Sequence, residues 1–165
     1  MKTLYILRHA KSSWKFPELK DFERPLSVRG TEEVPVMGAR FKARGARIGC
    51  IITSPAVRAK TTAVLFAEAI DYPVDDISSN PELYFAGKGM FLKAASLVDE
   101  EHESAMLVGH NPAITEFVNA MTGSNINNVF TCGLVTMQLP VTQWSDVAMG
   151  NAELVDFDFP KRNAG

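Results

Sequence analysis

The chain opens with a short apolar segment, Leu4-Tyr5-Ile6-Leu7, that runs directly into Arg8 and His9. A continuous apolar run of this length is typical of a strand buried on both faces of a sheet. In open α/β sheets, ligands bind beyond the carboxyl ends of the strands. Arginine offers a planar, doubly donating charge suited to phosphate, and histidine can act as a nucleophile or carry a proton. The pair therefore marks a candidate anion site; the simpler alternative is a strand that ends in two surface polar residues.

Strand-like and helix-like segments alternate along the rest of the chain, which predicts an α/β fold. We expect a three-layer α/β/α arrangement with a mainly parallel central sheet. Strands are expected at residues 3–7, 48–53, 74–77, 105–108, 134–138 and 152–156, and helices at residues 27–43, 54–70, 90–99 and 112–122. The last two strands allow antiparallel edges. With 165 residues and no repeat or linker, the chain is expected to form a single domain over residues 1–165.

Two of the expected helices begin with the same local signal. Ser54-Pro55 and Asn111-Pro112 each place a capping residue before a proline, which favours Ser54 and Asn111 as N-caps and each proline as the first helical residue. Free backbone N–H groups and the positive end of the helix dipole would then face the same edge of the sheet.

Three other segments carry weaker signals. The polar connections at residues 11–25 and 80–89 are long for a compact domain, and such loops are often functional. Pro35 lies inside the expected helix at residues 27–43, so it must kink this helix or delay its regular start. The tail at residues 159–165 is expected to fray.

Charge and composition exclude several classes of function. The net charge of −2 argues against non-specific nucleic-acid binding. No apolar run approaches the ~20 residues needed to span a membrane, and the first strand begins too close to Met1 for a secretory signal, so a cytoplasmic location is expected. Cys50 and Cys132 each lie among apolar neighbours and are interpreted as buried free thiols.

Polar groups follow three of the expected strands. The first strand delivers Arg8 and His9, the second delivers Ser54 and, one helical turn later, Arg58, and the strand at residues 105–108 delivers His110. If these strands are neighbours, two histidines and two arginines converge on one anion. A phosphoryl group fits such a cluster best.

Each residue also has a simpler interpretation. His110 could bond to its own turn, and Arg58 could be a surface charge. Asp21 and Arg24 could form an exposed pair of little energetic consequence. Glu82 could be solvated in its loop. The joint arrangement carries the prediction.

A metal site is the competing interpretation of two histidines. A catalytic zinc usually takes three protein ligands, often at tight spacing, which this sequence lacks. Arginines and helix N-termini beside the histidines would also repel a cation. We therefore expect neither a metal nor another cofactor. The glycine-rich loops that bind nucleotides are absent from the sequence as well.

Five ordered pieces of the sequence carry a resemblance to a known family. They are Leu7-Arg8-His9-Ala10-Lys11-Ser12, residues 21–30, residues 54–62, Glu82-Leu83-Tyr84 and Val108-Gly109-His110-Asn111-Pro112. Together they resemble the histidine phosphatase superfamily, which also contains the cofactor-dependent phosphoglycerate mutases. The nearest likeness is to the small phosphohistidine phosphatases of the SixA type.

The resemblance implies roles for these positions. His9 would accept the phosphoryl group and later be freed by water. Arg8 and Arg58 would hold the non-bridging oxygens, and His110 would complete the pocket. Such a site suits phosphoryl transfer, which depends mainly on in-line positioning and neutralised charge.

The resemblance also points to residues around this centre. Arg24 matches an additional phosphate contact, and Ser12 lies in the matched segment as a candidate substrate contact. Glu82 matches the carboxylate that protonates the leaving oxygen in the mutase-like branches, a group that the SixA-type branch can dispense with.

We therefore predict a metal-independent phosphatase that works through a covalent phosphohistidine on His9. Its substrate would be a phosphorylated protein, such as a protein phosphohistidine, or a small phosphate ester. Nucleic acid and membrane are not expected partners. The alternative is a phosphate- or phosphoprotein-binding module of the same fold with little turnover. Mutase activity is disfavoured because the covering loops are short.

Overall fold

The computed structural model describes residues 1–85 and 87–163. Its sheet has six strands in the order β3-β2-β4-β1-β5-β6. The strands are β1 (Lys2–Arg8), β2 (Cys50–Thr53), β3 (Ser78–Ser79), β4 (Ser104–Gly109), β5 (Leu134–Leu139) and β6 (Glu153–Asp158). The helices are α1 (Val28–Ala43), α2 (Val57–Ala69), α3 (Lys88–Ser96) and α4 (Ala113–Thr122). Short 3-10 segments lie at η1 (Asp21–Glu23), η2 (Val74–Asp76), η3 (Pro81–Leu83), η4 (Trp144–Asp146) and η5 (Pro160–Asn163).

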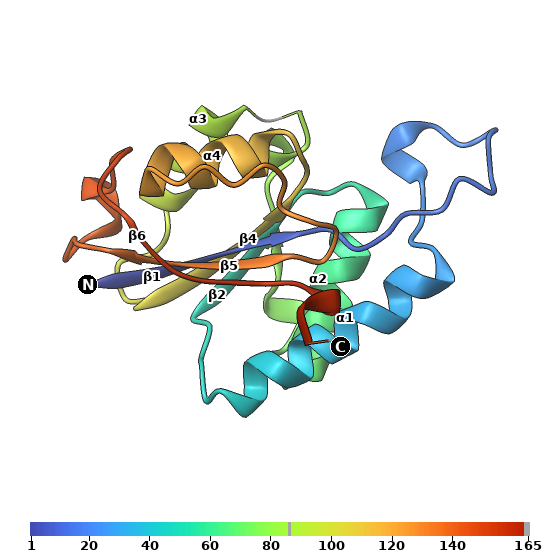
Figure 1. Ribbon diagram of the computed structural model, residues 1–165, viewed down its shortest axis with the longest axis horizontal. Helices are drawn as coiled ribbons and strands as arrows, with labels where there is room; N and C mark the ends of the chain where they lie inside the picture. Colours follow the sequence, from blue (N-terminus) through green and yellow to red (C-terminus); the bar gives the residue numbers. More distant parts are fainter. Residues whose placement is uncertain (86, 164–165) are drawn as a thin grey trace.

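The sheet is mainly parallel, as the sequence predicts. β1 pairs in parallel with β4, and β2 pairs in parallel with both β4 and β3. β5 runs antiparallel to β1 and to β6, which accounts for the antiparallel edge. α3 and α4 cover one face of the sheet, and α1 and α2 cover the other (Figure 1). The predicted three-layer α/β/α fold is therefore confirmed.

β1 lies inside the sheet and contributes to the core on both faces. Leu4 and Ile6 pack in the cluster that includes α3 and α4, while Tyr5 and Leu7 pack in the cluster that includes α1 and α2. This alternation follows from the two-residue period of a strand. Because β1 is held between β4 and β5, its carboxyl end presents Arg8 from a rigid support.

The segment between β1 and α1 extends beyond the carboxyl end of β1 and away from the sheet (Figure 1). It is tied down at both of its ends. Ser12 bridges to Leu26, and the N–H of Ser27 donates to the carbonyl of Lys11 at 2.8 Å. The Cβ that any other residue would carry at Gly30 would lie 2.2 Å from that carbonyl oxygen, so the close approach of α1 requires glycine.

The start of α2 differs from the prediction. The helix begins at Val57, with Ala56 at its N-cap, so Ser54 and Pro55 are neither cap nor first helical residue. The Ser54 hydroxyl accepts the N–H of Ala56 at 3.3 Å and also bonds to His110. The position of the Ser54 side chain is therefore determined by its hydrogen bond to His110, 56 residues later in the chain.

The start of α4 lies one residue later than predicted. Pro112 is the N-cap and Ala113 the first helical residue. The side chain of Asn111 still performs the capping, because its Oδ1 accepts the N–H of Thr115 at 3.1 Å. The helix ends at Thr122 and is followed by Gly123, whose φ of 70° is the left-handed conformation common after helices.

Further boundaries also differ. α1 runs without interruption through Pro35, so the proline does not delay its regular start. The strand expected at residues 74–77 is a 3-10 segment, and the strand follows as β3. The loop expected at residues 80–89 contains η3 and the first residues of α3, and residue 86 lies outside the described residues.

The tail is ordered where the structure describes it. η5 forms at Pro160–Asn163, and Arg40 donates to the carbonyls of Phe159 and Pro160 at 2.9 and 2.8 Å. The expected fraying is therefore wrong for these residues, while residues 164–165 lie outside the description. Cys50 and Cys132 are free cysteines, with Cys132 buried and Cys50 half-buried. None of the helices described reaches the combination of length and apolarity needed to cross a membrane.

Candidate active site

The carboxyl ends of three neighbouring strands, β2, β4 and β1, bring the predicted residues together. β1 ends at Arg8 and is followed by His9, β4 is followed by His110, and α2 carries Arg58 in its first turn. The rings of His9 and His110 have centroids 5.2 Å apart and are tilted by 50°. Imidazoles separated by 101 positions in the sequence therefore face one small volume.

His9 is fixed in one tautomer by its neighbour. Its Nδ1 lies 2.7 Å from the carbonyl oxygen of Ala10, and a carbonyl can only accept, so Nδ1 carries the proton and donates. Nε2 of the neutral ring then holds a free lone pair. The side chain is buried, and burial lowers its pKa to about 3, with the positive charge of Arg58 acting in the same direction. His9 is therefore a neutral imidazole at physiological pH.

His110 is held by Ser54. Its Nε2 lies 2.8 Å from the serine Oγ, and its Nδ1 is buried with no partner among the described residues. Burial, followed by the charge of Arg58, lowers the pKa of His110 to about 4. Tyr84 packs edge-on against the same ring, with centroids 5.6 Å apart. Two neutral imidazoles thus lie side by side in this site.

The two arginines supply the positive charge. Arg8 donates from Nη1 to the carbonyl of Val129 at 2.9 Å. Arg58 is 6% exposed and donates from Nη1 and Nη2 to Asp21. In both arginines Nε is buried and has no partner within the described chain. Buried donors without acceptors are rare in folded proteins and leave charge that an anion can neutralise.

Asp21 is a site residue that the sequence analysis missed. Its Oδ2 accepts from the Tyr84 hydroxyl at 2.7 Å and from Arg58 Nη2 at 3.0 Å. The Tyr84 hydroxyl and then Arg58 hold the pKa of the Asp21 carboxyl below its usual value. Asp21 also forms an ion pair with Arg24, whose Nε lies 3.4 Å from Oδ1. In the sequence, this pairing alone suggested an exposed ion pair without a role in the site. The only signal was its place at the start of the matched segment at residues 21–30.

Ser12 and Arg24 lie together at the edge of this site. Nη1 of Arg24 donates to the Ser12 hydroxyl at 3.0 Å, and the guanidinium lies 3.7 Å from the centre of the Trp14 ring. An exposed tryptophan in such contact holds the cation by a cation–π interaction. The predicted Ser12 and Arg24 are therefore brought to one another, and Arg24 is joined to Arg58 through Asp21.

A pocket of about 350 Å³ opens beside His110 and Arg58, and we call it the catalytic pocket. Arg58, His110, Tyr84 and Asp21 all line it. His9, Arg8 and Glu82 are not among its lining residues. Both carboxylate oxygens of Glu82 instead accept from Lys93 Nζ at 3.1 Å. The structure thus gathers four predicted residues, Arg8, Arg58, Ser12 and Arg24, around the two histidine rings or at the edge of the site. Glu82 instead forms an ion pair with Lys93 of α3.

Comparisons with known proteins agree with this geometry. The sequence model of the histidine phosphatase superfamily (branch 1) matches residues 4–84. An uncharacterised protein of Mycobacterium leprae is 29% identical over 94% of this chain and 100% of its own length. A candidate phosphohistidine phosphatase SixA from Agrobacterium tumefaciens is 28% identical, with a TM-score of 0.83 over 96% of this chain and 98% of that chain. The protein histidine phosphatase SixA in complex with tungstate shares the fold, with a TM-score of 0.81 at 22% identity over 96% of this chain and 97% of that one.

The matched segment begins inside β1 and ends at Tyr84, so it contains His9, Arg58 and the loop between them. The structural likeness extends over 96% of the chain. On these grounds the chain belongs to the histidine phosphatase superfamily, a superfamily of phosphatases, and is SixA-like in structure.

Proposed function

We propose that this phosphatase passes the phosphoryl group of its substrate to Nε2 of His9 and then to water. The observation that carries the proposal is the 2.7 Å contact between Nδ1 of His9 and the Ala10 carbonyl. This contact leaves Nε2 unprotonated, and burial keeps the ring neutral far below pH 7. A neutral, oriented imidazole is a nucleophile that needs no separate base.

The reaction divides into two displacements at phosphorus. In the first, the Nε2 lone pair forms a P–N bond while the bond from phosphorus to the leaving group breaks, and the leaving group departs with that electron pair and takes up a proton. In the second, a water oxygen attacks phosphorus and loses a proton to solvent. The P–N bond then breaks and its electron pair returns to Nε2 of His9. Inorganic phosphate leaves and the neutral imidazole is restored.

The surrounding charges suit the transferring group. Arg8, Arg58 and the rim residue Arg24 supply guanidinium groups for the non-bridging oxygens, Ser12 adds a hydroxyl beside Arg24, and His110 supplies an imidazole N–H on the far side of the pocket. Preorganised positive charge in a site shielded from water is the main source of rate in phosphoryl transfer.

We favour a protein phosphohistidine over an alkyl ester as the substrate. Asp21 is the carboxylate that lines the catalytic pocket. Its hydrogen bonds to Tyr84 and Arg58 hold its pKa low, so it is a poor proton donor. Glu82, the other candidate acid, is bonded to Lys93. A departing imidazole needs less protonation than a departing alkoxide, so a site without a strong acid suits a P–N bond. Of the two SixA structures compared above, one is described as a phosphohistidine phosphatase and the other as a protein histidine phosphatase.

Trapping the intermediate tests the proposal. Wild-type protein is mixed with ³²P-labelled phosphoramidate, quenched in alkali and analysed for protein-bound label, with EDTA present throughout. We expect acid-labile label on wild type and none on His9→Ala. The third histidine of the chain, His102, precedes β4 at the opposite end of the sheet, so His102→Ala is the matched control and should label like wild type. Label that persists in His9→Ala would contradict the proposal, and phosphate binding without label or turnover would favour the binding-module alternative.

A further inference from the structure

A second pocket lies on the other side of Arg8, with a volume of about 460 Å³. Cationic side chains dominate its lining, and one carboxylate joins them: Arg8, Lys11, Arg29, Lys161 and Glu33. We call it the basic pocket. The catalytic centre uses none of these side chains except Arg8.

The aromatic wall of the basic pocket is built by side chains from β6, the tail and the loop before β5. Phe130 stacks on Phe157, with centroids 6.0 Å apart, and meets Phe159 edge-on at 4.9 Å. Phe130 and Phe159 both line the pocket. The pocket therefore combines an apolar wall with several cations, which is the usual make-up of a site for a small organic anion or an acidic side chain.

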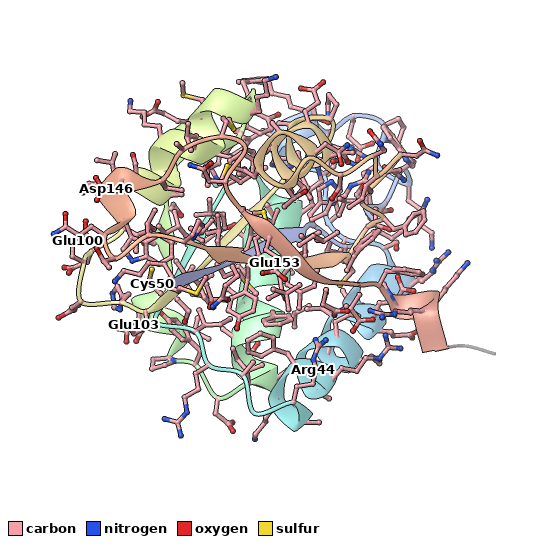
Figure 2. The ribbon with its side chains drawn as sticks, turned by 60° about the vertical axis from the view of Figure 1, so that its left-hand side comes forward. Arg44, Cys50, Glu100, Glu103, Asp146 and Glu153 are labelled. Atoms are coloured by element: carbon pink, nitrogen blue, oxygen red, sulfur yellow. The ribbon has the colours of Figure 1, made fainter. Side chains whose placement is uncertain are left out.

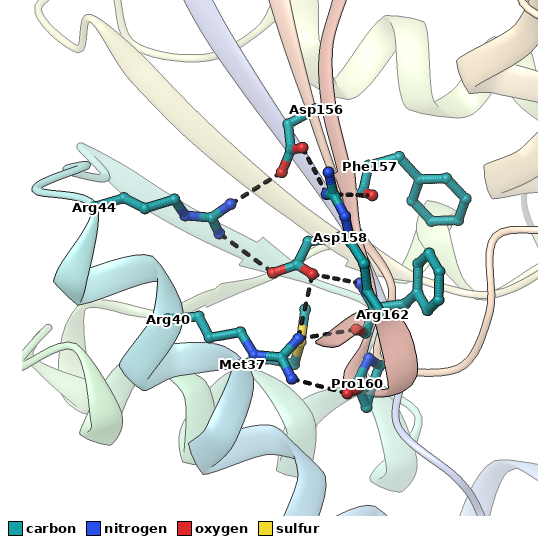
Figure 3. Close-up of polar contacts among 9 residues, drawn as sticks. Met37, Arg40, Arg44, Asp156, Phe157, Asp158, Pro160 and Arg162 are labelled. Carbon is teal, nitrogen blue, oxygen red and sulfur yellow. Dashed lines mark hydrogen bonds and ion pairs between the residues drawn. The ribbon is translucent and has the colours of Figure 1, made fainter. Parts of the chain in front are cut away.

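The tail that supplies Lys161 is held in place by α1 (Figure 3). Asp158 is 4% exposed, and its Oδ1 accepts from Arg40 Nη1 at 3.2 Å and from the N–H of Phe159 at 2.9 Å. The same guanidinium donates to the carbonyls of Phe159 and Pro160. Side chains on α1 thus fix the path of the backbone immediately before Lys161, so this wall of the pocket is preformed.

The charge of the basic pocket is not cancelled locally. Arg29 pairs with Glu33 at 3.3 Å, whereas Lys11 and Lys161 form no ion pair within the described chain. Asp158 near the tail is paired with Arg40. Three further carboxylates, Glu100, Glu103 and Asp146, lie on one side of the molecule, away from the tail (Figure 2). A chain with a net charge of −2 therefore still concentrates positive charge beside its catalytic site.

The basic pocket adjoins the catalytic pocket through shared hydrogen bonds. Arg8 Nη1 donates to the carbonyl of Val129 at 2.9 Å, and the side-chain amide of Asn111 donates to the same carbonyl at 3.0 Å. Asn111 lines the catalytic pocket, and Arg8 lines the basic one. The Val129 carbonyl therefore binds one lining residue of each pocket, so the two pockets are neighbours across Arg8.

We propose that the basic pocket binds a second anionic group, a carboxylate or phosphate, carried by the same substrate molecule as the phosphoryl group. The inference rests on the proposed function, because it assigns the second group to a substrate that His9 attacks. It adds a determinant of specificity: substrates with an acidic extension are preferred over neutral ones. The extension belongs either to a small phosphate compound or to an acidic peptide segment next to the phosphorylated residue.

The test compares two variants that lose the same charge. Lys11→Gln with Lys161→Gln removes two cations of the basic pocket. Lys60→Gln with Lys88→Gln removes two exposed lysines that do not line it. Two pairs of substrates distinguish the sources. One pair is phenyl phosphate and 4-(2-carboxyethyl)phenyl phosphate. The other is a phosphohistidine peptide flanked by aspartates and the same peptide flanked by alanines.

In wild type we expect a higher kcat/KM for the acidic member of at least one pair. This preference should fall at least about ten-fold in the pocket variant and change by less than about two-fold in the control variant. The pair that shows the effect identifies the source of the extension. A wild type without preference in either pair, or an equal loss in both variants, would overturn the inference. If wild type hydrolyses none of the four compounds, the proposed function has failed instead.

Discussion

The Asp21 carboxylate holds the guanidinium of Arg58, with Oδ2 3.0 Å from Nη2, while the Asp21 carbonyl accepts Nη1 of the same arginine at 2.7 Å. Arg58, which we propose binds the phosphoryl group, is thus already bound by an internal anion. Because the Asp21 side chain is 56% exposed and that of Arg58 is 7% exposed, the carboxylate closes the arginine from the solvent side. In the proposed mechanism, an incoming phosphoryl group would compete with Asp21 for this guanidinium.

Asp21→Asn should therefore tighten anion binding. Removing one negative charge at about 4 Å in a water-rich environment is worth about 1 kcal/mol, or about five-fold in affinity. The measurement is the inhibition constant of tungstate against hydrolysis of para-nitrophenyl phosphate. Asp146→Asn, in η4 at the far end of the sheet, controls for net charge. Weaker inhibition in Asp21→Asn would mean that the carboxylate orients Arg58 rather than competing for it.

Arg58→Ala should lower kcat/KM at least about thirty-fold, equivalent to about 2 kcal/mol of transition-state stabilisation. Arg58 is nearly buried beside His110, so no other cation can replace its charge without rearrangement. Arg58→Lys should recover part of the loss, because it restores the charge without the planar fork. Arg47→Ala is the matched control, because Arg47 is exposed and does not line the catalytic pocket, and it should leave kcat/KM unchanged. A rate for Arg58→Ala close to that of wild type would remove Arg58 from the site.

Glu82→Gln should reduce kcat by less than about two-fold with an alkyl phosphate such as glycerol phosphate. The Glu82 carboxylate is bonded through both oxygens to Lys93 and does not line the catalytic pocket. A loss of about a hundred-fold, restricted to substrates with poor leaving groups, would instead establish Glu82 as the general acid and require the loop to rearrange.

The free energy of unfolding should decrease as the pH is lowered from about 6.5 toward 4. The pKa of His9 is lowered to about 3 and that of His110 to about 4, so the folded protein keeps both rings neutral while the unfolded chain binds protons near pH 6.5. Each histidine then contributes a slope approaching about 1.4 kcal/mol per pH unit, and its full stabilisation is present above pH 6.5. Urea denaturation between pH 7.5 and 5 measures the slope. His9→Asn should make it shallower, and an unchanged slope would contradict the assignment.

Arg40→Ala should destabilise the protein by about 2–3 kcal/mol, because it leaves the Asp158 carboxylate buried without its main partner and removes donors from two backbone carbonyls. Arg44 pairs with Asp156 and Asp158 but is 41% exposed, so Arg44→Ala should cost less than about 1 kcal/mol. Thermal unfolding of the two variants provides the comparison. Equal and small losses would mean that α1 does not hold the tail.

Much of this fold can be predicted from local patterns. The apolar run of β1 packs on both faces, so Leu4 and Tyr5 fall into different core clusters as a buried strand requires. The polar residues after β1 and β4 mark the carboxyl ends of adjacent parallel strands, and this adjacency is what brings His9 to His110. These predictions succeed because the alternation of strand and helix is encoded over short distances in the sequence.

Interactions between distant residues could not be predicted in the same way. Asp21 and Arg58 are 37 positions apart, and Arg40 and Asp158 are 118 positions apart. Neither pair has a local signature, because the meeting of a loop or a tail with a helix depends on the finished fold. Ser54 illustrates the same point: its cap-like sequence is overridden by a hydrogen bond to His110. The roles of Asp21, Asp158 and Ser54 therefore depend on hydrogen bonds to residues distant in the sequence, which local sequence patterns do not predict.

The direction of β1 has a practical consequence. Because the strand runs from Lys2 to Arg8, the amino terminus and the catalytic edge lie at its opposite ends, about 20 Å apart at the rise of an extended strand (Figure 1). A dye, a bead or a surface coupled to Met1 would leave the histidine pair accessible. Coupling through Lys161 would instead crowd the basic pocket that this residue lines.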